Sequence, residues 1–234
     1  MNERLQTGNG DYGQVIGSSM AVDRQRVLRN TYWLLALSMV PTVLGAWIGV
    51  STGILATMGF GMSTMLFFVG AFGLMFLVEK TKNSSAGVYA LLGFTFFMGL
   101  MLSRLLAQIL GFKNGGSLIM MAFGGTGAIF FAMATLATVI KRDLSAMGKF
   151  LFVGAVILMV VGIVNIFLQS SALMLTMMVL AMGVFSAFML FDIKRVIDGG
   201  ETNYISATLA IYLDLYNVFQ SLLALLGIFG GDRE

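Results

Sequence analysis

Apolar residues fill seven long stretches of the chain, and short polar stretches separate them. Each stretch is close to the ~20 residues that a helix needs to cross a bilayer. Uninterrupted apolar runs of this length predict membrane-spanning helices, and the fold class is therefore an all-α integral membrane protein. The predicted spans are 31–52, 56–78, 86–110, 117–140, 148–168, 172–191 and 205–229.

The polar stretches divide the chain into one transmembrane domain, residues 31–229, and two tails. Residues 1–30 are polar, contain several glycines and show no apolar period, so we expect a disordered tail there. Residues 230–234 form a short tail at the other end. In the first span, Pro41 predicts a kink, and Gly45, Gly49 and Gly53 recur at the spacing that lets helices approach closely.

The last span, 205–229, carries polar residues on two faces. A helix without a purely apolar side is poorly suited to lipid, so we expect this seventh helix at the centre of the bundle, surrounded by the others. One face has the small and polar residues Asn203, Ala207, Ala210, Asp214, Asn217, Ser221 and Ala224. The other has Thr208, Tyr212, Tyr216 and Gln220.

Composition narrows the chemistry. Hydrophobic residues make up 58% of the chain and charged residues 11%, whereas a soluble domain has about 25% charged residues. Cysteine and histidine are both absent, which excludes disulfides, thiol catalysis, serine–histidine catalysis and the usual zinc sites. We therefore expect no enzyme and no bound cofactor, with the lipid bilayer as the chain's surroundings.

The basic residues predict the orientation. A sequence pI of 9.3 does not indicate nucleic-acid binding here, because eleven of the fourteen basic residues fall in the first tail and in the loops after spans two, four and six. The positive-inside rule puts that side in the cytoplasm and the C-terminus in the periplasm. The eleven are Arg4, Arg24, Arg26, Arg29, Lys80, Lys82, Lys141, Arg142, Lys149, Lys194 and Arg195.

Asp192 and Asp214 are the leading candidate site. An Asp at the centre of a spanning helix costs roughly 3 kcal/mol on insertion scales, and Asp214 lies about 13 Å into the last span, near mid-membrane. Gly199-Gly200 can end helix six, and Thr202 or Asn203 can cap helix seven, which makes the two helices antiparallel neighbours. Two buried carboxylates that meet would share one proton and form a pH latch.

The alternative is that Asp192 is an interfacial residue neutralised by Lys194, Arg195 or Lys82, while Asp214 alone hydrogen-bonds a neighbouring helix. Under the latch reading, Asn217 and Ser221 would extend an ion path whose oxygen ligands suit Ca²⁺ as a permeant ion. No firm metal site follows from the sequence, and it carries no signal for oligomeric state.

Two further charged residues are accessory candidates. Arg104 lies within span three and can either extend outward to the interface or turn inward to a carboxylate. Glu79 ends span two on the cytoplasmic side, either as a solvated boundary charge or as part of an acidic vestibule. The run from Lys141 to Ser145 is read as a loop with a helix cap.

Four segments resemble one family. They are VLRNTY (27–32), IKRDLS (140–145), GGETNYI (199–205) and YLDLYNVF (212–219), and they are similar to the Bax inhibitor-1 family, most of all to its bacterial YccA-type branch. The resemblance covers nearly the whole chain from Arg26. It implies a bacterial inner-membrane protein of seven helices, with the last surrounded by the other six.

The resemblance also implies two functions. The YccA branch binds FtsH, a membrane-bound ATP-dependent protease, and restrains its action on membrane substrates. In the calcium-leak branch, paired aspartates at the positions of Asp192 and Asp214 form a pH-sensing latch over a cation path. Either function is non-enzymatic. An intramembrane aspartyl protease would also need two aspartates, but Leu213 and Leu215 flank Asp214 where such enzymes carry glycine.

Overall fold

The computed structural model describes residues 7–232, except the side chains of residues 7–22 and of Phe60, and this part is helical throughout its regular structure. Seven helices are long and apolar enough to cross a membrane, which confirms the predicted class and the number of spans. The helices are α1 (Thr7–Thr52), α2 (Ile54–Thr57), α3 (Phe60–Thr81), α4 (Ser85–Leu110), α5 (Gly115–Val139), α6 (Ser145–Leu168), α7 (Ser171–Ile197) and α8 (Tyr204–Gly230).

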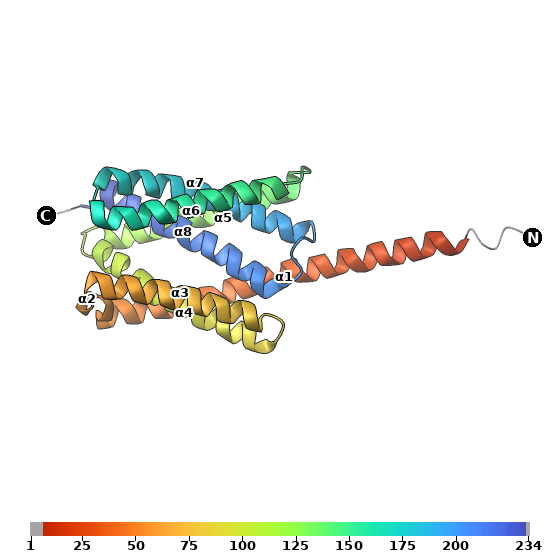
Figure 1. Cartoon of the computed structure of the whole chain (residues 1–234), viewed down its shortest axis with the longest axis horizontal. Coiled ribbons are helices and arrows are strands. Elements are labelled where there is room, and N and C mark those ends of the chain that lie inside the picture. Colours follow the sequence, from red (N-terminus) through yellow and green to blue (C-terminus); the bar gives the residue numbers. More distant parts are fainter. Residues whose placement is uncertain (1–6, 233–234) are drawn as a thin grey trace, which may run out of the picture.

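The first tail differs from the prediction. Helix α1 begins at Thr7, so residues 7–30 are helical rather than disordered, and Figure 1 shows this part of α1 extending away from the bundle. The chain's single proline is Pro41, so no proline breaks the helix before the first span, and each residue added to an existing helix adds one backbone hydrogen bond. Residues 1–6 of the predicted tail, and 233–234 of the second, lie outside the described part.

The three loops that join α3 to α4, α5 to α6 and α7 to α8 all lie at the end of the bundle from which α1 extends (Figure 1). These loops and the helix turns beside them hold seven of the eleven basic residues counted above. The described C-terminal end of α8 lies at the opposite end of the bundle. This arrangement agrees with the prediction that these loops lie on one side of the membrane, and it places the two ends of the spanning region on opposite sides.

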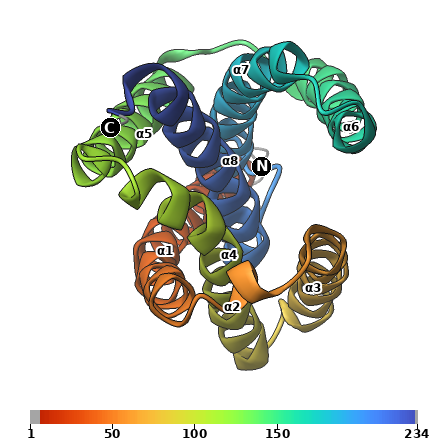
Figure 2. The same cartoon turned by 90° about the vertical axis from the view of Figure 1, so that its left-hand side faces the viewer.

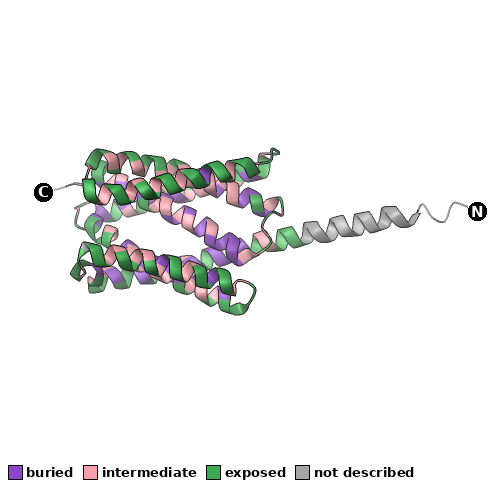
Figure 3. Ribbon diagram, in the orientation of Figure 1, coloured by how far each residue is buried: buried purple, intermediate pink, exposed green. Residues whose placement is uncertain are grey.

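Helix α8 packs against α1, α3, α4, α5 and α7, while α6 packs against α7. In the end-on view of Figure 2, α8 runs among the other helices, and α3 and α6 lie at the rim. Half of the apolar window of α8 is buried, the largest share among the seven spans. Figure 3 shows the same contrast, with buried residues along α8 and exposed residues covering the outer faces of α3 and α6.

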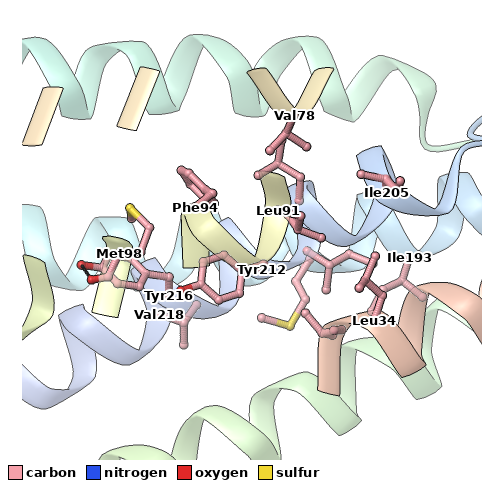
Figure 4. Packing of buried hydrophobic residues seen from close by; sticks show 14 of the residues in the cluster. Leu34, Val78, Leu91, Phe94, Met98, Ile193, Ile205, Tyr212, Tyr216 and Val218 are labelled. Atoms are coloured by element: carbon pink, nitrogen blue, oxygen red, sulfur yellow. Dashed lines mark hydrogen bonds between the residues drawn. The ribbon is translucent and has the colours of Figure 1, made fainter. Parts of the chain in front are cut away.

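The core gathers where α8 meets α1, α4 and α7. Phe94 and Met98 of α4 lie beside Tyr212 and Tyr216 of α8 (Figure 4), and all four are buried. The rings of Phe94 and Tyr212 meet edge to face, with centroids 6.0 Å apart. Such contacts fix the rotation of α8 about its axis, and this decides where its carboxylate points.

Glycines allow α1 and α4 to lie close together. A Cβ on Gly45 would collide with the backbone oxygen of Phe96, and one on Gly49 would collide with the side chain of Ser103. These two contacts match the close approach that the glycine spacing predicts. Gly53 differs, since it ends the run in a left-handed conformation (φ 62°) and leads into the short helix α2, which the sequence analysis did not anticipate.

The α7–α8 turn sets the register of the site. Helix α7 continues past Phe191 to Ile197 and closes at Gly199, whose φ of 80° favours glycine. Asn203 then caps α8 by accepting hydrogen bonds from the backbone N–H groups of Ile205 and Ser206. Its amide also donates to the backbone oxygen of Lys82 (3.0 Å), which ties the start of α8 to the α3–α4 loop.

The N-cap residue of α6 is Leu144, which provides no side-chain cap, but Asp143 just before it binds the first residue of the helix. The backbone N–H and the hydroxyl of Ser145 both donate to one carboxylate oxygen of Asp143. These bonds hold the pKa of Asp143 below its ordinary value. The run from Lys141 to Ser145 is therefore a loop and a helix start, as its sequence indicates.

Candidate functional site

Asp214 lies deep in the bundle. It is 4% exposed and lies about 15 Å along α8 from Tyr204, well inside the hydrocarbon region. Among the described residues, none forms a hydrogen bond with its carboxyl oxygen Oδ2. A buried polar oxygen without a partner is costly, and it marks a place where a proton, water or ion would be stabilised.

Asp192 of α7 supplies the nearest carboxyl group. It is partly buried, and the carboxyl groups of Asp192 and Asp214 lie within hydrogen-bonding reach of each other. A hydrogen bond between two carboxyl groups requires one proton, because two carboxylates only accept. The structure therefore brings together the two residues singled out from the sequence, in an arrangement suited to one shared proton.

The extension of α7 makes this meeting possible. With the predicted span ending at Phe191, Asp192 would lie at the membrane edge. Since α7 runs on to Ile197, another turn and a half of helix follows Asp192. The carboxyl group is thus held within a helix that packs along α8.

The three basic residues considered as partners of Asp192 form ion pairs with other carboxylates. Lys82 pairs with Glu79 (2.6 Å), Lys194 with Asp198 (2.7 Å) and Arg195 with Glu201 (3.6 Å). Arg195 is still near enough for its charge to act on Asp192. The alternative, in which one of these cations is the direct partner of Asp192, is not the arrangement found.

A cavity of about 240 Å³ lies beside the pair, toward the α7–α8 turn and between α3, α7 and α8. Asp192, Glu79 and Glu201 all line it, together with Arg195. Glu79 also accepts a hydrogen bond from the hydroxyl of Ser206 (2.8 Å) at the start of α8. Glu79 fits both of its predicted positions: it is an exposed boundary charge paired with Lys82, and it lines this acidic cavity, called the vestibule below.

A second cavity, of about 310 Å³, lies between α6, α7 and α8. Asn217 and Ser221 line it, beside Gln220 and several methionines. Ala210 lines the first cavity and Asn217 the second, and Asp214 lies between them on the same face of α8. The acidic pair thus separates two hollow regions along one helix face.

Arg104 is placed elsewhere. Its side chain is exposed, and its guanidinium donates to the hydroxyl of Ser63 on α3 (3.1 Å). Ser63 lies near the start of α3 and Arg104 near the end of α4, at the end of the bundle away from the α7–α8 turn. The structure gives this residue a place between helices rather than beside the acidic pair.

The second polar row of α8 joins helices together. Thr208 donates to the backbone oxygen of Thr31 on α1 (3.3 Å), and the hydroxyl groups of Tyr212 and Thr42 share a hydrogen bond of 2.9 Å. Tyr216 donates to the backbone oxygen of Met98 on α4 (3.3 Å). Three of the four predicted positions therefore hold α8 against α1 and α4, while Gln220 is exposed.

Two residues of the vestibule were not among the predicted site residues. Glu201 belongs to the GGETNYI motif, and Arg195 precedes it by one and a half helical turns. Arg195 and Glu201 lie on the two sides of the turn between α7 and α8. Their spacing weakly predicts an ion pair, since it does so only if the geometry of the turn is known. In the described part of the chain no group of three or more acidic residues is arranged to hold a metal ion.

Comparison with known proteins gives a family match over most of the chain. The family model described as "Inhibitor of apoptosis-promoting Bax1" matches residues 24–231. The chain is 38% identical over 207 residues to the Escherichia coli protein named "Modulator of FtsH protease YccA", which covers 88% of this chain and 92% of that protein.

Two other relatives have names that state no function. An uncharacterized membrane protein of Vibrio cholerae is 37% identical over 215 residues, covering 90% of this chain and 93% of that protein. An uncharacterized protein of Pseudomonas aeruginosa is 36% identical over 219 residues, covering 93% and 96%. The range matched by the family model, residues 24–231, includes the α7–α8 turn and the positions of both aspartates.

Proposed function

Since this chain belongs to the Bax inhibitor-1 family, we propose that it modulates a membrane-bound protease of the FtsH type and restrains its degradation of membrane proteins. The chain is a multi-pass inner-membrane protein. The observation that carries the proposal is its 38% identity, over 92% of the relative's length, to a protein named as a modulator of FtsH protease.

The architecture is suited to this work. The chain has no cysteine or histidine, and regulation by binding requires neither. Helix α1 extends from the end of the bundle predicted to be cytoplasmic (Figure 1), where an extended helix can reach a large partner. The exposed apolar faces of α3 and α6 offer further surface within the membrane.

A detergent pull-down tests the proposal. The tagged full-length chain should retain the FtsH-type protease of the same bacterium, and an unrelated multi-pass protein of similar size serves as the control bait. Retention well above the control supports the proposal. Retention no greater than the control contradicts it.

A second candidate function is a pH-gated leak of Ca²⁺ or another cation. The observation that favours it is the pairing of Asp192 with Asp214 between the two cavities. While the pair shares a proton, the hydrogen bond would hold α7 against α8. Loss of that proton as the pH rises would leave two adjacent negative charges, whose repulsion would part the helices and attract a cation.

Flux into liposomes tests this second function. Ca²⁺ entry should increase as the pH rises, and the double variant Asp192→Asn, Asp214→Asn should lose this dependence because no shared proton remains. Asp143→Asn is the matched control, since Asp143 is an exposed carboxylate far along the chain from the pair. Absence of flux, or an unchanged pH profile in the double variant, would exclude the gate.

A further inference from the structure

Gln220 is an unusual residue for the outer surface of a membrane helix. Its side chain is exposed, and no described residue forms a hydrogen bond with its amide. It lies about 24 Å along α8 from Tyr204 and about 15 Å from Gly230, which places it inside the ~30 Å hydrocarbon region. An amide at this depth lacks the water that would satisfy it at the membrane edge.

Gln220 lies beside a mostly apolar cavity. It borders the 310 Å³ cavity between α6, α7 and α8, with Asn217 and Ser221 on the same helix. The cavity is open to the membrane, because its lining residues Met159 and Met174 are 42% and 38% exposed. The methionines that line it are Met159, Met174, Met177 and Met178, and methionine-rich surfaces adapt to partners of differing shape.

The chemistry of the surface identifies the kind of occupant. Lipid acyl chains fill an apolar groove, but they have no group that can hydrogen-bond to an amide. A transmembrane helix can provide both an apolar face and a polar side chain at the required depth, and interhelical hydrogen bonds of this kind join helices within membranes. Small residues beside the amide, such as Ser221 and Ala155, allow such a helix to approach closely.

We propose that the cavity between α6, α7 and α8 is the docking site for a transmembrane helix of the protease partner, with the Gln220 amide hydrogen-bonded to a polar side chain of that helix. The inference rests on the proposed function and adds the surface that serves it. Helix α6 suits a rim position, since only 6% of its apolar window is buried.

Cross-linking in membranes tests the site. The chain has no cysteine, so Gln220→Cys gives a single thiol that takes a photoactivatable maleimide. Phe123→Cys on α5 is the matched control, because Phe123 is 67% exposed and lies about 24 Å from the end of its helix, the same depth as Gln220. Irradiation should give at least threefold more adduct with the protease at position 220 than at position 123.

The outcomes separate this inference from the proposed function. If the unsubstituted chain fails to retain the protease, both are overturned. If it retains the protease but adducts form equally at both positions, or position 220 reacts only with lipid or a second copy of the chain, the docking site is wrong while the function stands.

A change that adds no probe gives an independent test. Gln220→Leu should lower protease retention about threefold, the size expected when one interhelical hydrogen bond is lost. Gln108→Leu is the control, since Gln108 is also exposed but lies near the end of α4, where water can satisfy its amide. Equal retention by the two variants would contradict the proposed hydrogen bond.

Discussion

At the scale of single residues, hydroxyl groups decide how the last helix is held. The hydroxyls of Thr208, Tyr212 and Tyr216 reach α1 and α4 from one face of α8. Asp214, the buried acidic residue of α8, lies on a different face of the helix from these hydroxyl groups. The hydroxyl groups of Thr208, Tyr212 and Tyr216 thus join α8 to its neighbours, whereas Asp214 lies in the region between the two cavities.

Tyr212→Phe should destabilise the folded protein by about 1 kcal/mol or more, because it removes the hydroxyl's hydrogen bonds with Thr42 on α1 and with the backbone oxygen of Thr95 on α4, without changing the ring's packing. Tyr212 is 1% exposed, so water cannot replace the lost partner. The measurement is unfolding of the purified protein in detergent. Tyr89→Phe, at a site 75% exposed, should leave stability unchanged, and an equal loss in both variants would contradict this reading.

The sequence identifies a charged residue as a candidate only where the surrounding residues make a charge unusual. Asp192 and Asp214 stand out because a carboxylate in an apolar run is rare whatever its surroundings. The vestibule residues Glu201 and Arg195 do not stand out, since charged residues are ordinary in a loop. The two are brought to Asp192 by the angle of the turn, which a one-dimensional pattern does not contain.

At the scale of elements, close contact between α1 and α4 depends on glycine. Gly45 of α1 faces the backbone of Phe96, and Gly99 of α4 faces the backbone of Thr42. Backbone atoms cannot move aside as a flexible side chain can. The two helices therefore approach one another only while both positions lack a Cβ.

Gly45→Ala should cost about 2 kcal/mol or more of stability, because the added methyl group forces α1 and α4 apart. Gly93→Ala is the matched control in α4, since a Cβ there meets nothing within 4 Å. That change should be neutral or slightly stabilising, as alanine favours a helix over glycine. Thermal unfolding of the two variants compares them, and a smaller loss in Gly45→Ala than in Gly93→Ala would contradict the packing described.

The hydrophobic pattern predicts the elements far better than their ends. Six of the seven predicted spans coincide with single helices, and the remaining one, 56–78, begins in α2 and continues through α3; length and apolarity are sufficient to identify a crossing. Helix α7 continues through Lys194 and Arg195 to Ile197, and α1 begins as early as Thr7. The residues in these extensions are largely polar, so the hydropathy of the sequence does not reveal that they are helical. Polar residues continue a helix as readily as they end it, so hydropathy cannot set these boundaries.

At the scale of the whole molecule, the bundle has an acidic region on the end that carries most of the positive charge. Glu79, Asp192 and Glu201 line one cavity there, and the basic residues lie in the surrounding loops and helix ends. A cation or a basic segment approaching from this side would meet the loops first and the vestibule next. Both candidate functions involve this end of the bundle. In the cation leak it would be the start of the ion path, and in protease modulation it would be the side that faces the protease domain.

The orientation of the molecule is a prediction that a pair of fusions can check. Alkaline phosphatase, which folds only outside the cytoplasm, should be active when joined after Glu234 and inactive when joined in the α5–α6 loop near Arg142. A fluorescent protein that requires the cytoplasm should give the reverse result. Activity of the phosphatase in the α5–α6 loop would contradict the orientation derived from the basic residues.

The central claim is that this chain restrains a membrane-bound protease, and the most direct measurement is the rate at which that protease degrades a membrane substrate. Vesicles would contain the FtsH-type protease and substrate, with or without an excess of the full-length chain. The account predicts slower loss of the substrate when the chain is present, and a return toward the free rate with Gln220→Leu. An equal rate of degradation with and without the chain would contradict it.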